Sequence, residues 1–244
     1  MLKTCIIIPA RYASTRFEGK PLVELCGKPM VLWVADTCAK LLGKDNVFVA
    51  TDDERIQSVV DNSGYQSIMT GNCLTGTDRV AEAAKQIDAD IYVNVQGDEP
   101  CINSADILQV IDVKSKNLGK VVNAYRFLTP KEDPTNSNIP KVVTTETNKL
   151  LYMSRSCIPG SKKDVSYAIK KQVCIYAFTI EELNLFYNFS RKSYLEKIED
   201  IEILRFLDLD RTVLMTEVGS ESVAVDCIED VKIAEQTIRR TWKK

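Results

Sequence analysis

Short apolar runs alternate with helical patterns in the first part of the chain, and this alternation limits the possible folds more than any other feature. The runs are rich in β-branched residues and end at turn-forming residues, which predicts strands at 4–8, 47–51, 66–70 and 90–96. Between them, helical spacing of apolar residues predicts helices at 30–42, 53–62 and 78–87. Strands alternating with helices predict an α/β fold with a doubly wound, mostly parallel sheet.

The pattern changes after Pro100. A helix is expected at 104–116, followed by strands at 121–128, 141–156 (broken by a turn near Asn148) and 172–179. The rest of the chain predicts a long helix at 195–209, a strand at 212–218 and a final helix from Ile228. We therefore expect a single domain over 1–244 that carries a β-rich insertion at about 121–179.

Charge and hydropathy exclude several classes of function. The 244 residues carry a formal net charge of -2, whereas duplex-binding proteins usually have a basic excess, so no nucleic-acid partner is expected. No apolar run approaches the roughly 20 residues that span a bilayer, and the first strand begins without a signal-peptide pattern. We expect no membrane insertion and a cytoplasmic location.

Histidine is absent, and the cysteines have no metal-binding spacing. The histidine count of 0 excludes imidazole acid–base chemistry and histidine-activated nucleophiles. The 8 cysteines include no CxxC pair, which argues against a zinc site and a disulfide framework. Any catalysis must use carboxylates, Lys, Arg, Tyr, backbone groups or a metal held by oxygen.

The first predicted strand leads directly into a basic loop. The stretch IIIPARYASTRFEGKPL contains Arg11, Arg16 and Lys20 but only one acid, Glu18. Ligands of a parallel α/β sheet bind beyond the carboxyl ends of its strands, so this loop could hold phosphates with its amides and basic side chains. It lacks the glycine patterns of a Walker loop and of a dinucleotide fingerprint. A solvated basic loop is the alternative.

Two aspartates are candidate ligands of a hard cation. Asp98 follows a buried strand in NVQGDEP, and one or two carboxylates with substrate phosphates are typical ligands of Mg²⁺. Asp226 follows the apolar run in VAVDCIEDV. The alternatives are a plain turn at Asp98 and an N-cap at Asp226, with Glu229 at capping-box distance.

Six segments, taken in order, resemble one family. The segments IIPARYASTRFEGKPL, GKPM, VATDDERI, GTDR, VNVQGDEP and YMSRSCIP are similar to those of the 3-deoxy-manno-octulosonate (Kdo) cytidylyltransferases, or CMP-Kdo synthetases. The resemblance covers nearly the whole chain and is most specific up to Pro159. It implies a nucleotidyltransferase fold of the glycosyltransferase-A-like type, whose insertion is used in dimerisation, so a homodimer is expected.

The resemblance also implies a reaction and a set of site residues. CTP and an acidic small-molecule acceptor would react with Mg²⁺ as cofactor, and pyrophosphate would leave. Asp98 and Asp226 would ligate the metal, and Lys20, Arg11 and Asp98 would be catalytic. The nucleotide would be bound by Pro9, Ala10, Arg11, Lys20, Thr75, Gly76, Arg79 and Gln96.

The acceptor half departs from the family pattern. Where the family usually reads HLGIYGY, this chain reads QVCIYAF, with Gln172 in place of histidine and Cys174 in place of glycine. Where the family reads LEQLR, this chain reads IEILR, with Ile203 in place of glutamine. The expected acceptor contacts are Arg155, Gln172, Tyr176 and Glu202. Arg155 would hold the carboxylate by bidentate geometry, and a salt bridge to a nearby acid is its alternative.

The sequence therefore predicts a Mg²⁺-dependent cytidylyltransferase that makes a CMP-sugar from CTP and Kdo or a close analogue. The resemblance further implies a role in lipopolysaccharide biosynthesis. Three alternatives stay open. The acceptor could be an amino-substituted Kdo, another ulosonic acid or a phosphonate, because the departures cluster where the family binds its sugar acid. The chain could bind CTP without turnover, or it could use another base.

Overall fold

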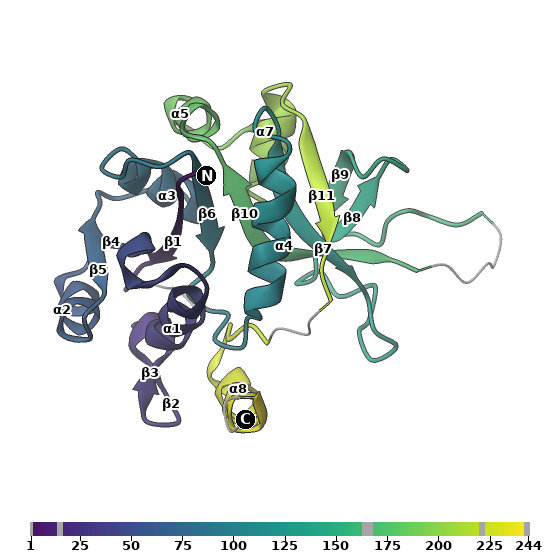
Figure 1. The fold of residues 1–244 in the computed structure, drawn as a ribbon. Coiled ribbons are helices and arrows are strands. Elements are labelled where there is room, and N and C mark those ends of the chain that lie inside the picture. Colours follow the sequence, from purple (N-terminus) through teal and green to yellow (C-terminus); the bar gives the residue numbers. More distant parts are fainter. Residues whose placement is uncertain (1, 14–16, 163–167, 220–222, 242–244) are drawn as a thin grey trace.

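A computed structural model describes residues 2–13, 17–162, 168–219 and 223–241, and one twisted sheet forms its centre (Figure 1). The strand order is β11-β7-β10-β6-β1-β4-β5. The pairs from β6 to β5 are parallel, β10 is antiparallel to β6 and β7, and β11 is parallel to β7. The strands are β1 (Thr4–Ala10), β4 (Val47–Thr51), β5 (Gln66–Met69), β6 (Ile91–Val95), β7 (Val121–Phe127), β10 (Lys170–Phe178) and β11 (Val213–Glu217). The predicted fold class is confirmed.

Helices cover both faces of the sheet because its central strands are apolar on both sides. Ile6 and Ile8 of β1 point into one core, and Ile7 points into the other; all three are fully buried. The first core is covered by α1 (Met30–Leu42), α2 (Glu54–Asn62) and α4 (Ser104–Ser115). The second is covered by α3 (Gly76–Ala84), α5 (Ile180–Asn188) and α7 (Leu204–Asp208).

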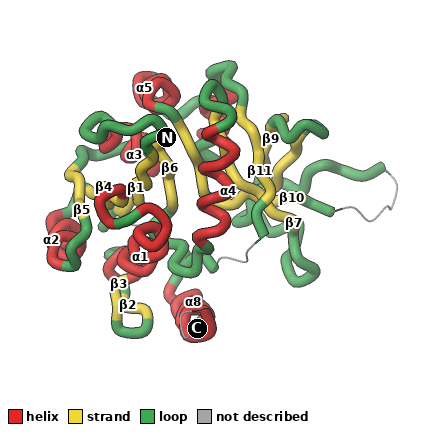
Figure 2. Tube along the Cα trace, viewed as in Figure 1, coloured by secondary structure: helices red, strands yellow, loops and turns green. Residues whose placement is uncertain are grey.

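The C-terminal helix α8 (Ile228–Thr241) packs outside this three-layer body, beside the small β2–β3 ribbon (Figure 2). The ribbon consists of β2 (Glu24–Leu25) and β3 (Lys28–Pro29). Ala234 and Ile238 of α8 share an apolar cluster with Leu25 and Met30. Burial of these side chains therefore holds the last helix beside the start of α1.

The segment predicted as an insertion, 121–179, contributes two strands to the central sheet. β7 and β10 lie inside the strand order, and only β8 (Lys141–Thr144) and β9 (Leu150–Ser154) branch from it, through pairing of β8 with β10. In Figure 1 these two strands lie on the side of the sheet away from β5. Arg16 and part of the polar segment between β9 and β10, residues 163–167, lie outside the described residues.

The prediction of one long helix at 195–209 is wrong. Two short helices, α6 (Tyr194–Glu199) and α7, are separated at Asp200, which adopts a left-handed conformation with φ 50°. Helix α5 was not predicted, although its capping box of Thr179 and Glu182 is readable in the sequence. No helix in the described part of the chain is long and apolar enough to cross a membrane.

Candidate active site

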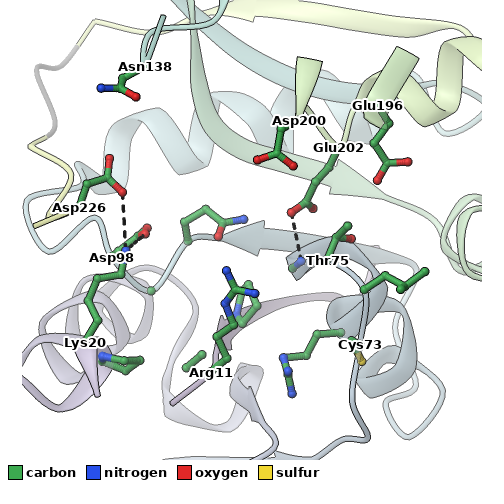
Figure 3. Close-up of a pocket in the computed structure, with 18 of the residues that line it drawn as sticks. Arg11, Lys20, Cys73, Thr75, Asp98, Asn138, Glu196, Asp200, Glu202 and Asp226 are labelled. Carbon is green, nitrogen blue, oxygen red and sulfur yellow. Dashed lines mark hydrogen bonds and ion pairs between the residues drawn. The ribbon is translucent and has the colours of Figure 1, made fainter. Parts of the chain in front are cut away.

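A cavity of about 660 Å³ opens beyond the carboxyl ends of β1 and β6 (Figure 3). It has two sides, which we name by their origin. The strand-end wall comprises Arg11, Lys20, Asp98 and Asp226, and the helical wall comprises Arg155, Glu196, Asp200 and Glu202. The other predicted site residues along the cavity are Pro9, Ala10, Thr75, Gly76, Arg79 and Gln96.

Lys20 joins the two predicted metal ligands on the strand-end wall. Its Nζ lies 2.5 Å from Asp98 Oδ2 and 3.8 Å from Asp226 Oδ1. The two aspartates are far apart in sequence, but the Val225 amide donates to the Asp98 carbonyl over 2.9 Å. This backbone bond brings the segment before α8 alongside the end of β6, so both carboxylates face one cation.

The end of β6 packs so closely on β1 that there is little room for a side chain at Gly97. A Cβ atom at Gly97 would lie 3.1 Å from the Pro9 carbonyl oxygen and 3.3 Å from Ile8 Cγ2. A side chain at this position would therefore need a shift of a few tenths of an ångström in the turn or in β1. Asp98 lies in a turn, which was the alternative to a metal-ligand role for this residue. The same turn directs its carboxylate into the cavity.

The strand-end wall has a donor set that suits a hard cation. Two carboxylates converge on the Lys20 ammonium, so their negative charges lie close enough together to share one cation. The described residues contain no group of three or more His, Cys, Asp or Glu side chains placed to hold a metal. A metal here would need oxygen ligands from a substrate as well, which is usual for Mg²⁺. At the start of α8, the Asp226 and Cys227 amides both donate to Asp230.

The predicted nucleotide residues of α3 are held at its N-terminus. Thr75 is the N-cap, and its hydroxyl accepts from the Asp78 amide. Arg79 is almost fully buried, and it donates to Asp52 over 2.6 Å and to the Thr70 hydroxyl over 2.5 Å. Its guanidinium therefore fixes α3 against the end of β4 and also borders the cavity.

Glu202 and Gln96 both lie beside Gly76 at the same helix N-terminus: a Cβ atom on Gly76 would be 3.5 Å from Glu202 Oε1 and 3.6 Å from Gln96 Nε2. The Gly76 and Thr77 amides donate to the two oxygens of Glu202, over 3.1 and 2.8 Å. Gln96 Nε2 donates to Asn94 Oδ1 over 3.3 Å. Glu202, predicted as an acceptor contact, therefore ties the α6–α7 segment to the nucleotide side of the cavity.

Arg155 is anchored by main-chain oxygens. Its Nε donates to the Glu199 carbonyl over 2.5 Å, and its two terminal nitrogens donate to the Ser137 and Asp200 carbonyls, each over 2.9 Å. Within the described part of the chain its guanidinium forms no salt bridge, so the alternative predicted for Arg155 is not what the structure shows. A guanidinium has five N–H groups, so two remain for a ligand.

The structure does not bring Gln172 and Tyr176 to the cavity wall. Gln172 Nε2 donates to Asn123 Oδ1 over 3.0 Å and to the Tyr176 hydroxyl over 3.2 Å. The register of β10 shifts between Val173 and Tyr176, and Asn123 donates to two carbonyls in this bulge. Both predicted acceptor residues therefore face β7. Their role in acceptor binding stays a prediction.

Several cavity residues were missed from the sequence. Asp200 and Lys192 form an ion pair of 2.7 Å, and the hydrogen bond from Lys192 lowers the pKa of Asp200. Glu196 belongs to the capping box of α6, which the SYLE segment displays. That pattern could have marked the helix start, but nothing local marks Asp200 as the residue at which the helix ends.

A loop over 128–140 also reaches the cavity, through Ser137 and Asn138. In Figure 3 Asn138 lies above Asp226, across the cavity from Lys20. Lys141 is fully buried and donates to the Asn136 and Arg155 carbonyls, over 2.9 and 2.5 Å. A buried cation thus fastens this loop to the strand that carries Arg155.

Three comparisons relate this geometry to known proteins. A family model described as cytidylyltransferase matches residues 5–213. A 3-deoxy-manno-octulosonate cytidylyltransferase of Geotalea uraniireducens (strain Rf4) is 39% identical over 244 residues, covering 95% of this chain and 97% of that protein. An 8-amino-3,8-dideoxy-manno-octulosonate cytidylyltransferase of Shewanella amazonensis is 33% identical over 245 residues, covering 98% and 99%.

Solved structures show the same relationship. A CMP:2-keto-3-deoxy-manno-octonic acid synthetase complexed with CTP superposes with a TM-score of 0.90 at 32% identity, covering 98% of this chain and 99% of that one. A putative glucose-1-phosphate thymidylyltransferase from Bacillus anthracis shares the fold, with a TM-score of 0.69 at 15% identity, covering 97% and 95%.

Proposed function

The chain belongs to the cytidylyltransferase family, and from this premise we propose that it forms a CMP-sugar from CTP and Kdo or a close analogue, with release of pyrophosphate. The relatives at 33–39% identity are named for Kdo or 8-amino-Kdo, and the similar solved structure is complexed with CTP. In this reaction the anomeric hydroxyl of the acceptor attacks the α-phosphorus of CTP. The P–O bond to pyrophosphate breaks, and the proton of the hydroxyl passes to water.

The convergence of Lys20, Asp98 and Asp226 is the observation that carries this proposal. Nucleotidyl transfer needs charge neutralisation and alignment more than a covalent nucleophile, and a chain without histidine can supply both. Arg11 is exposed at the cavity and forms no ion pair with the described residues, so it can take up a phosphate. Lys20 reaches the same space and would offset charge on the departing pyrophosphate.

We propose Mg²⁺ as the cofactor, held by Asp98 and Asp226. When bound, it would neutralise phosphate charge and lower the pKa of the acceptor hydroxyl, so that no histidine base is needed. The turn at Gly97 and the Val225 bond to Asp98 fix the two carboxylates side by side before any ligand arrives.

The helical wall would receive the acid acceptor. Arg155 has two N–H groups left after its three carbonyl contacts, and a carboxylate can accept both. The attacking hydroxyl of a 2-keto acid is close to its carboxylate, so a held carboxylate positions the nucleophile. Binding of an acceptor here would place it between Arg155 and the triphosphate on Arg11 and Lys20.

Assembly and setting are also part of the proposal. We propose a homodimer that uses the β8–β9 region, where Leu151 is 54% exposed. Cytoplasmic location and a role in lipopolysaccharide synthesis rest on the resemblance and on the names of the relatives. Light scattering on wild type and Leu151→Asp tests the dimer: the variant is expected to be monomeric, and an unchanged dimer would contradict use of this surface.

The decisive experiment measures pyrophosphate release from CTP and Mg²⁺ with a panel of acids. Kdo and 8-amino-Kdo are tested beside another ulosonic acid and a phosphonate, and the three other nucleoside triphosphates replace CTP in turn. Release with CTP and one octulosonate, lost on chelation of the metal, is the expected result. CTP binding without turnover of any acid would contradict the proposal and favour a non-catalytic CTP-binding protein.

A matched pair of variants guards against a contaminating activity. Lys20→Ala removes a cation from the cavity, whereas Lys28→Ala removes a nearby cation that pairs with Asp36 outside it. Only the first should lose pyrophosphate release. Equal activity of both variants would show that the measured release does not come from this site.

A further inference from the structure

Arg205 links the two sides of the cavity from behind its walls, although it does not line the cavity itself. Its side chain is fully buried. It pairs with Asp78 of α3 and with Glu196 of α6, and both carboxylates are almost fully buried. We call Asp78, Glu196 and Arg205 the Arg205 clasp.

The clasp uses every hydrogen of the guanidinium. Nη1 and Nη2 donate to the two oxygens of Asp78 over 2.7 and 3.0 Å, and Nε and Nη2 donate to the two oxygens of Glu196, each over 2.7 Å. The remaining Nη1 hydrogen is donated to the Phe186 carbonyl over 3.2 Å. The guanidinium carbon also lies 3.6 Å from the centre of the Phe186 ring. Such a bidentate double pair fixes orientation as well as distance.

The two carboxylates carry one more negative charge than Arg205 compensates, and both lie in the first turn of a helix. Asp78 accepts a further bond from the Thr75 hydroxyl over 2.7 Å. Glu196 accepts one from the Ser193 amide over 2.9 Å. Burying charge is costly unless each oxygen is satisfied, and here the helix starts supply the missing donors. The clasp therefore specifies one arrangement of α3 against α6.

A continuous chain of contacts runs from the nucleotide side to Arg155. Thr75 borders the cavity and bonds Asp78, Arg205 joins Asp78 to Glu196, and α6 carries Glu196 at one end. The other end of α6 supplies the Glu199 carbonyl, and the next residue supplies the Asp200 carbonyl, that hold the Arg155 guanidinium. A displacement of α6 would therefore move Arg155.

We propose that Arg205 is a positioning residue that sets the place of Arg155 relative to the nucleotide turn at Thr75 through the clasp. This rests on the proposed function, because it assigns the acceptor to Arg155 and the nucleotide to Thr75. Helix α3 also packs on β1, β4 and β6, whereas α6 packs mainly on α7. Loss of the clasp should thus move the acceptor side more than the nucleotide side.

The kinetic test is Arg205→Lys. Lysine keeps the charge but cannot hold two carboxylates in bidentate fashion, so kcat/KM for the acceptor should fall about 100-fold, as for an active site displaced by about 1 Å. The KM for CTP should change far less. Normal constants for both substrates would overturn the proposal.

A second buried pair gives the control. Lys114 is fully buried and lies 2.6 Å from Glu182, but neither residue borders the active-site cavity. Lys114→Met should lower the melting temperature and leave kcat and both KM values unchanged, when each protein is assayed at the same margin below its own melting temperature. If Arg205→Lys behaves in the same way, Arg205 has only a structural role.

A test without substrates separates this proposal from the proposed function. Glu196→Gln keeps the shape of the side chain and removes one charge of the clasp. Hydrogen exchange, followed by mass spectrometry, should become faster both in the peptide over 75–79 and in the peptide over 194–199. Faster exchange of the Glu196→Gln variant in both peptides would support the clasp, whatever the wild type does with substrates. If the wild type then turned over no acid, the proposed function alone would be overturned. Faster exchange over 194–199 alone would overturn the clasp.

Discussion

The two walls of the cavity hold their charges in different ways. On the strand-end wall, Lys20 pairs with both Asp98 and Asp226, and these three side chains are 16%, 30% and 46% exposed. On the helical wall, Arg155 is fixed by three main-chain carbonyls and Glu202 by two main-chain amides. Partners on the first wall can be exchanged for a ligand, whereas the second wall keeps its shape.

The largest expected effect comes from the exchangeable wall. Lys20→Ala should lower kcat about 10³-fold, because a cation aimed at developing phosphate charge acts mainly in the transition state. The melting temperature should change little, since both aspartates stay open to solvent. Steady-state pyrophosphate release and thermal unfolding give the two quantities. If the lower kcat of Lys20→Ala were explained entirely by a lower melting temperature, the proposed contrast between the walls would be contradicted.

Arg155→Lys tests the fixed wall. One ammonium cannot keep three carbonyl contacts and also offer a fork to a carboxylate, so the KM for the acceptor should rise about 10- to 100-fold. The KM for CTP should stay near its wild-type value. Initial rates over a grid of both substrates provide the measurement. An equal rise in both KM values would mean that the walls do not divide the substrates as proposed.

Gly97→Ala tests how sensitive kcat is to a small displacement of Asp98 on the strand-end wall. The added Cβ would approach the Pro9 carbonyl to 3.1 Å, shift the turn and move Asp98. We expect kcat to fall about tenfold, because small displacements of an active-site group are costly. Gly119→Ala is the control, since its Cβ would meet nothing within 4 Å. Equal rates for the two variants would show that the β6 turn tolerates displacement.

Glu132 provides the smallest effect, in the 128–140 loop that spans the walls. Burial opposes ionisation, but bonds from Lys171 and the Thr129 amide outweigh it and lower the pKa of Glu132 to about 2. A lowered folded-state pKa gives stability that is present above the unfolded value and lost as the pH falls toward 2. Glu132→Gln should cost about 1 kcal/mol near neutral pH.

Urea unfolding of wild type and Glu132→Gln at several pH values checks this. The difference in the free energy of unfolding should shrink as the pH falls from about 7 toward about 3, because wild type then loses the ionised carboxylate. A difference that is constant with pH would show that the Glu132 charge does not stabilise the loop.

The strand-end wall could be predicted from the sequence because its signals are local. Apolar runs of alternating strands and helices gave the sheet, and residues just after β1 and β6 had to meet at its carboxyl edge. Asp226 was placed there by resemblance. What the sequence could not show is the Val225 bond to Asp98, which joins segments at opposite ends of the chain.

The helical wall could not be predicted as well, because its geometry depends on tertiary contacts. Helical spacing continues across Asp200, yet the helix breaks there so that the Glu199 and Asp200 carbonyls can meet Arg155. The β10 bulge turns Gln172 and Tyr176 toward Asn123, which no local pattern marks. Side-chain direction at a bulge follows from the partner strand.

Among the described residues that line the cavity, Asp226 comes last in the chain. The strands of the sheet, the basic loop and Asp98 all precede it in the chain, so only the segment after β11 supplies the second carboxylate. This segment docks through Val225 and the α8 cluster with Met30. A chain cut short before Asp226 would keep every strand of the sheet in its sequence but lack the second carboxylate, so we expect it to lose pyrophosphate release.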